Sequence, residues 1–301
     1  MIQKTLISVV GPTAIGKTAL SIGLANAYDT EIISADSRQF YKEMSIGTAV
    51  PSKEELAAAK HHFIQHISIF QDYSVGDFEK EALVCLDELF QKKDVVVLVG
   101  GSGLYVDALT KGLDQFPEVP SAIKESLQKD FNEKGLTYLQ NLLKEVDPVY
   151  HNKVDLENPM RVLRALEVSL TENKPYSSYI GNNKKERPFR TIYIGIDAPR
   201  AIVYKRIEDR VDIMIQEGLL EEAKALVEHK KLNALNTVGY KELFSYFDKE
   251  CDLETAISEI KKNTRRFAKR QGTWFRKNQD IHWVSWDKAL EQALELLKNE
   301  I

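Results

Sequence analysis

The feature that most constrains the fold is a glycine-rich phosphate-binding motif near the start of the chain. Residues 11–18 read GPTAIGKT and match the pattern G-x-x-x-x-G-K-[ST]. A β-branched run precedes the motif at residues 6–10, and apolar residues at helical spacing follow it at 18–27. Backbone amides of such a loop surround phosphate oxygens, Lys17 supplies a positive charge, and the Thr18 hydroxyl can bind Mg²⁺. The motif therefore predicts a strand, a loop and a helix that hold a di- or triphosphate ligand.

Three further apolar runs predict strands of a parallel sheet. They lie at residues 31–34, 94–99 and 191–196, and a helical pattern at 77–91 precedes the second of them. Alternation of strands and helices is typical of a parallel sheet that helices cover on both faces. We therefore expect an α/β fold like that of the P-loop NTPases, with residues 191–196 as its last strand.

Between the last two of these strands the sequence pattern becomes helical. Residues 122–170 carry apolar side chains at helical spacing and contain no strand-like run. We predict an all-helical insertion domain at 114–189, within a core made of residues 1–113 and 190–301.

Composition limits the classes of partner. The 301 residues carry 41 basic and 45 acidic side chains, a net charge of -4, which excludes a protein that coats nucleic acid with a wholly basic surface. Cys85 and Cys251 lie far apart and outside any Cys/His cluster, so we expect no disulfide framework and no zinc site. No run of about 18 apolar residues occurs, and the N-terminal apolar run is too short for a secretion signal. We expect a cytoplasmic protein with no membrane partner.

The predicted strand at 94–99 argues against one group of P-loop proteins. It ends in Gly100, Gly101, Ser102 and Gly103, without the carboxylate that positions Mg²⁺ and water in many ATPases. A motor or switch ATPase is therefore disfavoured, whereas a small-molecule kinase stays open.

Asp36 and a pair of arginines are candidate ligand-binding groups. Asp36 follows the second predicted strand, where ligands bind in open parallel sheets, so it is either a proton acceptor or the cap of a following helix. Its spacing does not distinguish these roles. Arg206 and Arg210 share one helix face and both can reach a single anion. The same spacing also fits a solvated face paired with Glu208 or Asp209, which is the favoured interpretation.

A strongly basic stretch lies near the C-terminus. Residues 261–277 read KKNTRRFAKRQGTWFRK, with eight Lys or Arg and no Asp or Glu. On a helix Phe267 and Trp274 share one face, which we expect to be part of the core, and the cations lie mostly on the other faces. The lack of acidic partners in the stretch favours contact with a nucleic-acid phosphate backbone.

Seven segments together resemble one known family. They are GPTAIGKT from Gly11, ISADSRQFYKEMSIGTA from Ile33, LVGGSGLYVDAL from Leu98, NPMRVLRALEV from Asn158, RIEDR from Arg206, VGYKEL from Val238 and TRRFAKRQGTWFRK from Thr264. The set is similar to the tRNA dimethylallyltransferases, or tRNA isopentenyltransferases, in their compact bacterial form. The resemblance implies transfer of a dimethylallyl group from dimethylallyl diphosphate to N6 of adenine 37, 3′ to the anticodon, in tRNAs that read codons beginning with U.

The resemblance also implies roles for individual residues. Asp36, Thr13 and Arg210 would be catalytic, with Asp36 accepting the proton of the adenine amine, and Thr18 would bind the cofactor Mg²⁺. The diphosphate would be held by Gly11, Thr13, Ala14, Ile15, Gly16, Lys17, Thr18 and Arg210. The tRNA anticodon stem-loop is expected to contact the insertion, and the expected tRNA-binding residues are Asp36, Ser37, Arg38, Gln39, Ser102, Met160, Arg161, Val162, Leu163, Arg164, Arg265, Arg266, Lys269 and Arg270. We expect a monomer.

Three residues depart from the family pattern. Val50 stands where the family has lysine, Gln65 where it has aspartate, and Gly272 where an apolar residue is usual. None of these changes removes a proposed catalytic group. Three other functions stay open, namely prenylation of free adenine nucleotides, phosphoryl transfer by a small-molecule kinase, and nucleotide-regulated RNA binding without catalysis.

Overall fold

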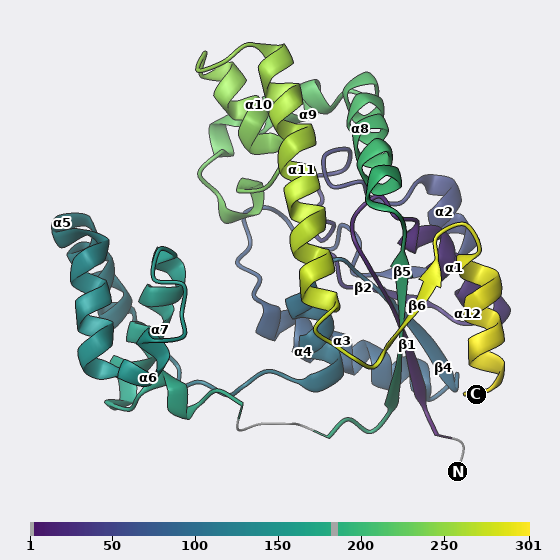
Figure 1. Ribbon diagram of the computed structural model, residues 1–301, viewed down its shortest axis with the longest axis horizontal. Helices are drawn as coiled ribbons and strands as arrows, with labels where there is room; N and C mark the ends of the chain where they lie inside the picture. The colour runs from purple at the N-terminus through teal and green to yellow at the C-terminus, as the bar shows by residue number, and fades with distance from the viewer. Residues whose placement is uncertain (1–2, 182–185) are drawn as a thin grey trace. The chain divides into compact units, whose positions relative to one another are not determined.

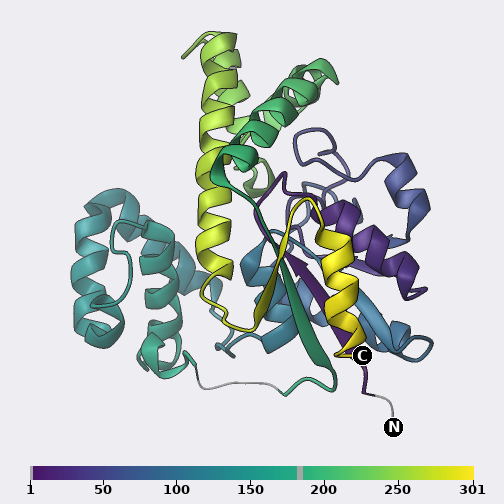
Figure 2. The same cartoon turned by 45° about the vertical axis from the view of Figure 1, so that its right-hand side comes forward.

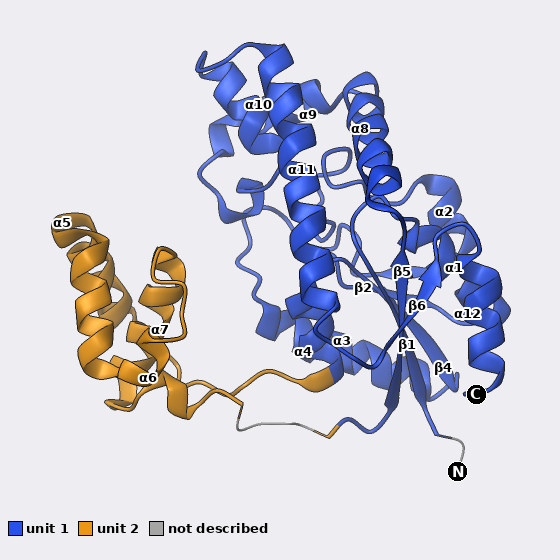
Figure 3. Ribbon diagram, in the orientation of Figure 1, with its two compact units in different colours: residues 1–110, 187–301 blue, residues 111–186 orange. Residues whose placement is uncertain are grey.

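The computed structural model describes residues 3–181 and 186–301, and it separates into two compact units (Figure 3). Unit 1 combines residues 1–110 with 187–301, and unit 2 consists of residues 111–186. The sequence predicts the inserted part at 114–189, and residues 182–185 of that prediction lie outside the described residues. Each unit has a hydrophobic core of its own, as expected of a domain inserted into another.

Unit 1 is built on a six-stranded sheet in the order β3-β2-β4-β1-β5-β6 (Figure 1). Every neighbouring pair of strands is parallel. The strands are β1 (Thr5–Val10), β2 (Ile32–Ser34), β3 (His61–His62), β4 (Val95–Val99), β5 (Arg190–Asp197) and β6 (Ile281–Ser285). The central strands β1 and β4 are buried along their whole length, which explains their continuous apolar sequence. The predicted α/β class is confirmed.

Side chains of the central strand alternate between the two faces of the sheet. Leu6 and Val10 of β1 join a cluster that includes α3 and α4, whereas Ile7 and Val9 join a second cluster with α1 and α12. The helices around the sheet are α1 (Lys17–Ala27), α2 (Lys53–Ala58), α3 (Val75–Phe90), α4 (Gly103–Lys111) and α12 (Ala289–Lys298). Helices therefore bury both faces, as the sequence predicts.

Strand β6 corrects the prediction that residues 191–196 form the last strand. It pairs with β5 at the edge of the sheet, and only Ile281 and Val284 of its five residues are buried. A half-exposed edge strand has no continuous apolar run, so the pattern that identifies the central strands missed it. The two-residue strand β3, at the opposite edge, is too short for any periodicity.

The C-terminal part of unit 1 contributes a group of further helices. These are α8 (Arg200–Gln216), α9 (Leu219–Ala225), α10 (Tyr240–Phe247) and α11 (Leu253–Phe275), with short 3-10 helices at Val227–His229 and Asn233–Leu235. Helices α8 and α11 pack side by side, as both views show (Figures 1 and 2). The basic stretch of α11 thus lies next to the helix that carries Arg206 and Arg210.

Unit 2 contains helices and no strand in its described residues. Its helices are α5 (Ser121–Val146), α6 (Pro148–His151), α7 (Pro159–Glu172) and a 3-10 helix at Tyr176–Ser178. Helix α5 is interrupted at Gly135, whose φ is +77°. The buried Asp147 carboxylate accepts the Ser177 N–H at 2.6 Å and the Tyr150 N–H at 2.9 Å, which ties the 3-10 helix to α6. None of the helices in the described parts of either unit is long and apolar enough to cross a membrane.

Candidate active site

The phosphate-binding loop connects β1 to α1 in a conformation that requires glycine at both ends. Gly11 has φ +142°, and a Cβ there would lie 3.1 Å from the Ile196 carbonyl oxygen of β5. Gly16 has φ +108° immediately before α1. Between them Ala14 has φ +61°, in the left-handed region that L residues rarely adopt. The loop therefore follows the strand–loop–helix arrangement that the motif predicts.

Lys17 contacts the backbone of the phosphate-binding loop directly. Its Nζ donates to the Pro12 carbonyl oxygen at 2.8 Å. Burial lowers the pKa of Lys17 to about 8, and the charge of Asp36 opposes this shift while that of Arg210 adds to it. An ammonium held this way lacks a full counter-charge, so a bound anion would stabilise its protonated form.

Arg206 and Arg210 both reach the phosphate-binding loop from α8. Arg206 Nε donates to the Ala14 carbonyl oxygen at 2.7 Å, and Arg210 Nη1 lies 3.4 Å from the Thr13 hydroxyl. Burial and the charge of Arg206 lower the pKa of Arg210. The favoured interpretation of a solvated face paired with acidic neighbours is wrong. Glu208 pairs instead with a cation of α11, and Asp209 with Lys205.

Asp36 lies at the carboxyl end of β2 and faces these cations. Its Oδ1 accepts the Arg38 N–H at 3.2 Å, and its backbone oxygen accepts the Gln39 N–H at 3.0 Å. Turns follow it, so the helix-cap interpretation is wrong. Burial raises the pKa of Asp36, and the charges of Lys17, Arg38 and Arg210 oppose that shift. The carboxyl group is thus held in a desolvated position beside three cations.

The three residues after Asp36 are engaged with the protein itself. Ser37 N–H donates to the Ser102 hydroxyl at 3.2 Å, which joins this turn to the glycine-rich end of β4. Arg38 Nη1 donates to the backbone oxygens of residues 233 and 234 at 3.0 and 2.9 Å. Gln39 Nε2 donates to the Ala49 oxygen at 2.8 Å. These contacts support the Asp36 turn, and the predicted tRNA contacts of these three residues stay predictions.

Glu222 of α9 anchors the loop that supports Gln39, and the sequence offered no signal for it. Its carboxylate accepts the N–H groups of Ser45, Ile46 and Gly47, each at 2.9 Å. It also accepts the Tyr240 hydroxyl at 2.6 Å, and burial together with this carboxylate raises the pKa of Tyr240. One side chain therefore satisfies three backbone donors of a turn close to the site.

Gln271 of α11 is a second residue that sequence reasoning missed. It is 6% exposed, its Oε1 accepts the Thr13 N–H at 2.8 Å, and its Nε2 donates to the Gly101 oxygen at 2.9 Å. The available signal was its helical register, because Gln271 shares a buried face with Ala268 and Phe275. A polar residue on such a face must find hydrogen-bond partners.

The cations of the basic stretch fall into two groups. Some pair with acidic residues outside the stretch, such as Arg265 with Glu208 of α8 at 2.7 Å. Arg266, Lys269 and Arg270 are exposed and form no ion pair with any residue in the described ranges. The stretch itself contains no acidic residue, but α8 supplies Asp212 and Glu208 as partners, and Glu259 of α11 pairs with Lys262.

The two aromatic residues of the stretch are also placed differently from the prediction. Phe267 is 37% exposed and Trp274 is 41% exposed, so neither belongs to the core. Trp274 Nε1 donates to Asp107 of α4 at 2.9 Å, and the Arg270 guanidinium lies over the Phe267 ring. These rings extend the exposed basic surface of α11.

Within unit 2 the predicted tRNA-binding segment divides into outer and inner residues. Met160 is 73% exposed, and Arg161 and Arg164 are exposed beside it. Val162 and Leu163 are buried in the core of unit 2, which corrects the expectation that their side chains contact tRNA. An α-helix turns one face inward with a period of about 3.6 residues, so a continuous segment cannot present every side chain to one ligand.

One of the departures from the family pattern, Gln65, has a local explanation. Gln65 Nε2 donates to the Ser45 hydroxyl at 2.7 Å and to the Lys42 oxygen at 3.1 Å, so it supports the loop after β2 without a carboxylate. A Cβ on Gly272 would meet open space, so nothing in the fold requires glycine there. Nothing in the structure explains Val50.

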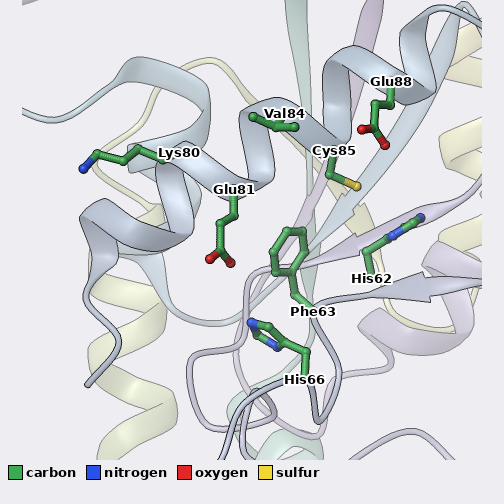
Figure 4. Close-up of a pocket in the computed structure, with 8 residues that line it drawn as sticks. All are labelled: His62, Phe63, His66, Lys80, Glu81, Val84, Cys85 and Glu88. Atoms are coloured by element: carbon green, nitrogen blue, oxygen red, sulfur yellow. The ribbon is translucent and has the colours of Figure 1, made fainter. Parts of the chain in front are cut away.

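A cavity of about 540 Å³ lies away from the phosphate-binding loop (Figure 4). Phe63 and His66 enter it from the loop after β3, and Val84 and Cys85 from α3. None of its lining residues is a predicted site residue. The lining residues are His62, Phe63, His66, Lys80, Glu81, Val84, Cys85 and Glu88.

Fold and site together define a P-loop α/β protein with half-buried cations, Lys17 and Arg210, at the loop and one acidic group facing them. The family model for IPP transferase matches residues 39–278, and the chain belongs to this family. It is 58% identical over 296 residues to the tRNA dimethylallyltransferase of Christiangramia forsetii, with 98% of each chain covered. The resemblance drawn from the seven sequence segments is confirmed.

Solved structures agree with this family membership. A full-length tRNA isopentenylpyrophosphate transferase from Bacillus halodurans matches with a TM-score of 0.74 and 33% identity, covering 99% of this chain and 96% of that one. A eukaryotic dimethylallyltransferase described as acting on tRNA matches with a TM-score of 0.84 and 26% identity, covering 99% of this chain and 79% of that one. Most of the chain therefore shares its fold with known members of the family.

Proposed function

We propose that this protein transfers the dimethylallyl group of dimethylallyl diphosphate to N6 of adenine 37 in tRNAs that read codons beginning with U. Its relatives bear the name tRNA dimethylallyltransferase. The observation that carries the proposal is the meeting of Lys17, Arg210 and Asp36, whose charges act on one another beside the phosphate-binding loop. Two cations there suit a diphosphate, and the carboxylate suits a proton acceptor.

The departing diphosphate is stabilised by groups at the phosphate-binding loop. The carbon–oxygen bond breaks with its electron pair on the diphosphate, so negative charge grows on oxygens near Lys17, Arg210 and the loop amides. Groups already oriented in a desolvated site stabilise such charge more than water does. The Thr13 hydroxyl, which lies 3.4 Å from Arg210 Nη1, would donate to the same oxygens.

The residues present fit a Mg²⁺ ion bound mainly by the substrate. No group of three or more His, Cys, Asp or Glu side chains in residues 3–181 and 186–301 could hold a metal ion. Mg²⁺ in phosphate sites commonly takes only one or two protein ligands besides phosphate oxygens and water. Thr18, in the first turn of α1, would hold it, and the ion would neutralise charge on the departing diphosphate.

The nucleophile is activated on the Asp36 side. The adenine N6 forms a bond to the allylic carbon and passes one proton to Asp36. A carboxylate whose pKa is raised by burial is a stronger base than an exposed one. The base must leave its stack to reach the site, which costs less in a single-stranded anticodon loop than in a duplex.

The tRNA would be held by exposed cations. On α11 these are Arg266, Lys269 and Arg270, and on α7 they are Arg161 and Arg164. Contacts of such cations with phosphates bind RNA without reading its sequence. We propose a monomer that works in the cytoplasm.

Label transfer from radiolabelled dimethylallyl diphosphate tests the proposal. The acceptors are unmodified tRNA with adenine 37, the same tRNA with guanosine 37, AMP and ATP, each with Mg²⁺. We expect label in the first acceptor alone. Label in AMP or ATP would assign the protein to free-nucleotide prenylation, and transfer of the γ-phosphate of ATP to an acceptor would identify a kinase.

A further inference from the structure

The buried carboxamide of Gln271 connects α11 to two other segments, the phosphate-binding loop and the glycine-rich turn after β4. Its oxygen can only accept and its amino group can only donate, and the two partners are the Thr13 N–H and the Gly101 carbonyl oxygen. The carboxamide therefore has a single orientation in which both hydrogen bonds form. Through it the phosphate-binding loop is joined to the end of β4.

The Thr13 N–H belongs to a peptide group that is held from both sides. The carbonyl oxygen of the same Pro12–Thr13 peptide accepts the Lys17 ammonium at 2.8 Å. A peptide group is planar, so its rotation would break the hydrogen bonds to Gln271 and to Lys17 together. The following Ala14 has φ +61°, a conformation that persists only where surrounding contacts support it.

The glycine-rich turn after β4 leaves the space that the carboxamide occupies. A Cβ on Gly101 would lie 2.3 Å from Gln271 Nε2 and 3.7 Å from Lys17 Nζ. Any larger residue at 101 would displace the carboxamide from its partners. The position of Gln271 thus depends on Gly101 as much as on α11.

We propose that Gln271 is a positioning residue for the diphosphate. It holds the Pro12–Thr13 peptide, and thereby sets where the Lys17 ammonium and the Thr13 hydroxyl meet the departing oxygens. The kinetic part of this inference rests on the proposed function, whereas its prediction for diphosphate binding does not.

The variant Gln271→Met keeps the length of the side chain and removes both hydrogen bonds. We expect KM for dimethylallyl diphosphate to rise about tenfold and kcat to fall about tenfold, as for loss of buried hydrogen bonds. KM for tRNA should stay within about twofold of the wild-type value. A general loosening of α11 would raise KM for tRNA as well, because the same helix carries Arg266, Lys269 and Arg270.

Two companion variants separate positioning from folding. Gln292→Met on α12 removes one exposed hydrogen bond, which Gln292 Oε1 accepts from the Ser285 N–H of β6 at 2.8 Å, and should leave the kinetics unchanged. Gly101→Ala displaces the carboxamide without changing Gln271, so it should reproduce the effect of Gln271→Met. The double variant should be no worse than either single variant, because both remove the same interaction.

Calorimetric titration with inorganic diphosphate and Mg²⁺ gives the readout that does not depend on prenyl transfer. Weaker diphosphate binding by both Gln271→Met and Gly101→Ala, in protein that melts as the wild type does, supports the inference. Unchanged diphosphate affinity in a folded variant overturns it, as does an equal rise in both KM values. Wild-type protein that binds diphosphate but does not prenylate tRNA contradicts the proposed function alone.

Discussion

The phosphate-binding loop and helix α11 both present cations to an anion, but they do so in opposite ways. Around the loop, Lys17 and Arg210 are desolvated, and burial lowers the pKa of both. On α11 the cations Arg266, Lys269 and Arg270 are exposed. Buried charges act strongly on a small anion at short range, whereas exposed charges act weakly and are screened by salt.

This difference predicts that the two regions bind different substrates. The loop should determine the chemistry and the affinity for diphosphate, with little dependence on salt. The outer face of α11 should determine the affinity for tRNA, with strong dependence on salt. Variants of each region should therefore change different kinetic constants.

The largest effect is expected for Asp36→Asn. This change keeps the shape of the side chain and the Arg38 N–H contact but removes the proton acceptor. We expect kcat to fall about 1,000-fold, within the range for loss of a general base, and tRNA affinity to stay within about twofold. Single-turnover label transfer and filter binding measure the two quantities. Turnover near the wild-type level would exclude Asp36 as the base.

Arg210→Lys tests whether the half-buried Arg210 contributes through the shape of its guanidinium group as well as its charge. Lysine keeps the charge but loses the guanidinium group that reaches the Thr13 hydroxyl. We expect kcat/KM for dimethylallyl diphosphate to fall about 100-fold. The matched control is Arg200→Lys, an exposed arginine at the start of the same helix, which should change nothing. Equal kinetics of the two variants would contradict the role of Arg210.

The triple variant Arg266→Gln, Lys269→Gln and Arg270→Gln tests the exposed group on α11. Removal of three phosphate contacts should lower the slope of log affinity against log salt by about 2 and weaken tRNA binding about tenfold or more. KM for dimethylallyl diphosphate should not change. Titration of labelled tRNA over a salt series measures the slope.

The control for this triple variant lies on the same helix. Lys261, Lys262 and Arg265 carry the same charge but pair with acidic side chains at 2.6 to 2.7 Å. Their replacement by glutamine should lower the salt slope by less than about 1. If both triple variants lower the slope equally, the distinction between paired and exposed cations is wrong.

The pH dependence of kcat/KM for dimethylallyl diphosphate should report the ionisation of Asp36 and of Lys17. The free enzyme needs deprotonated Asp36, whose pKa is raised by burial, and protonated Lys17, whose pKa is lowered to about 8. The rate should therefore rise through the acidic range and fall about tenfold per pH unit above the Lys17 pKa. In Lys17→Arg the fall of kcat/KM at alkaline pH should disappear. If kcat/KM of the wild type stays constant up to pH 10, the alkaline limb cannot be assigned to Lys17.

The smallest effect is expected for Gly272→Ala, which concerns stability alone. Gly272 lies inside α11, and a Cβ there would meet open space. Alanine should raise the free energy of unfolding by about 1 kcal/mol, because glycine is the poorer helix former. Urea denaturation measures the change, with unchanged kinetics as the accompanying expectation. A destabilised variant would show that this position is more crowded than the structure indicates.

The loop and the central sheet could be predicted because their signals are local. Residues 11–18 combine glycines, a lysine and a threonine at spacings that a single turn imposes, and β1 and β4 are continuous apolar runs because both faces are buried. The seven segments that resemble the family lie within local elements in the same way. They identify the class of reaction without any tertiary contact.

The partners of individual side chains were decided only by the tertiary structure. The spacing of Arg206 and Arg210 defines a shared helix face, but the fold determines that this face meets the phosphate-binding loop. Likewise, Glu208 is distant in sequence from Arg265, and the packing of α8 against α11 brings them together. Gln271 and Thr13 are 258 residues apart, a separation at which no periodicity relates two positions. Periodicity reports how a residue lies on its own element, whereas the chemistry of this site depends on which elements pack together.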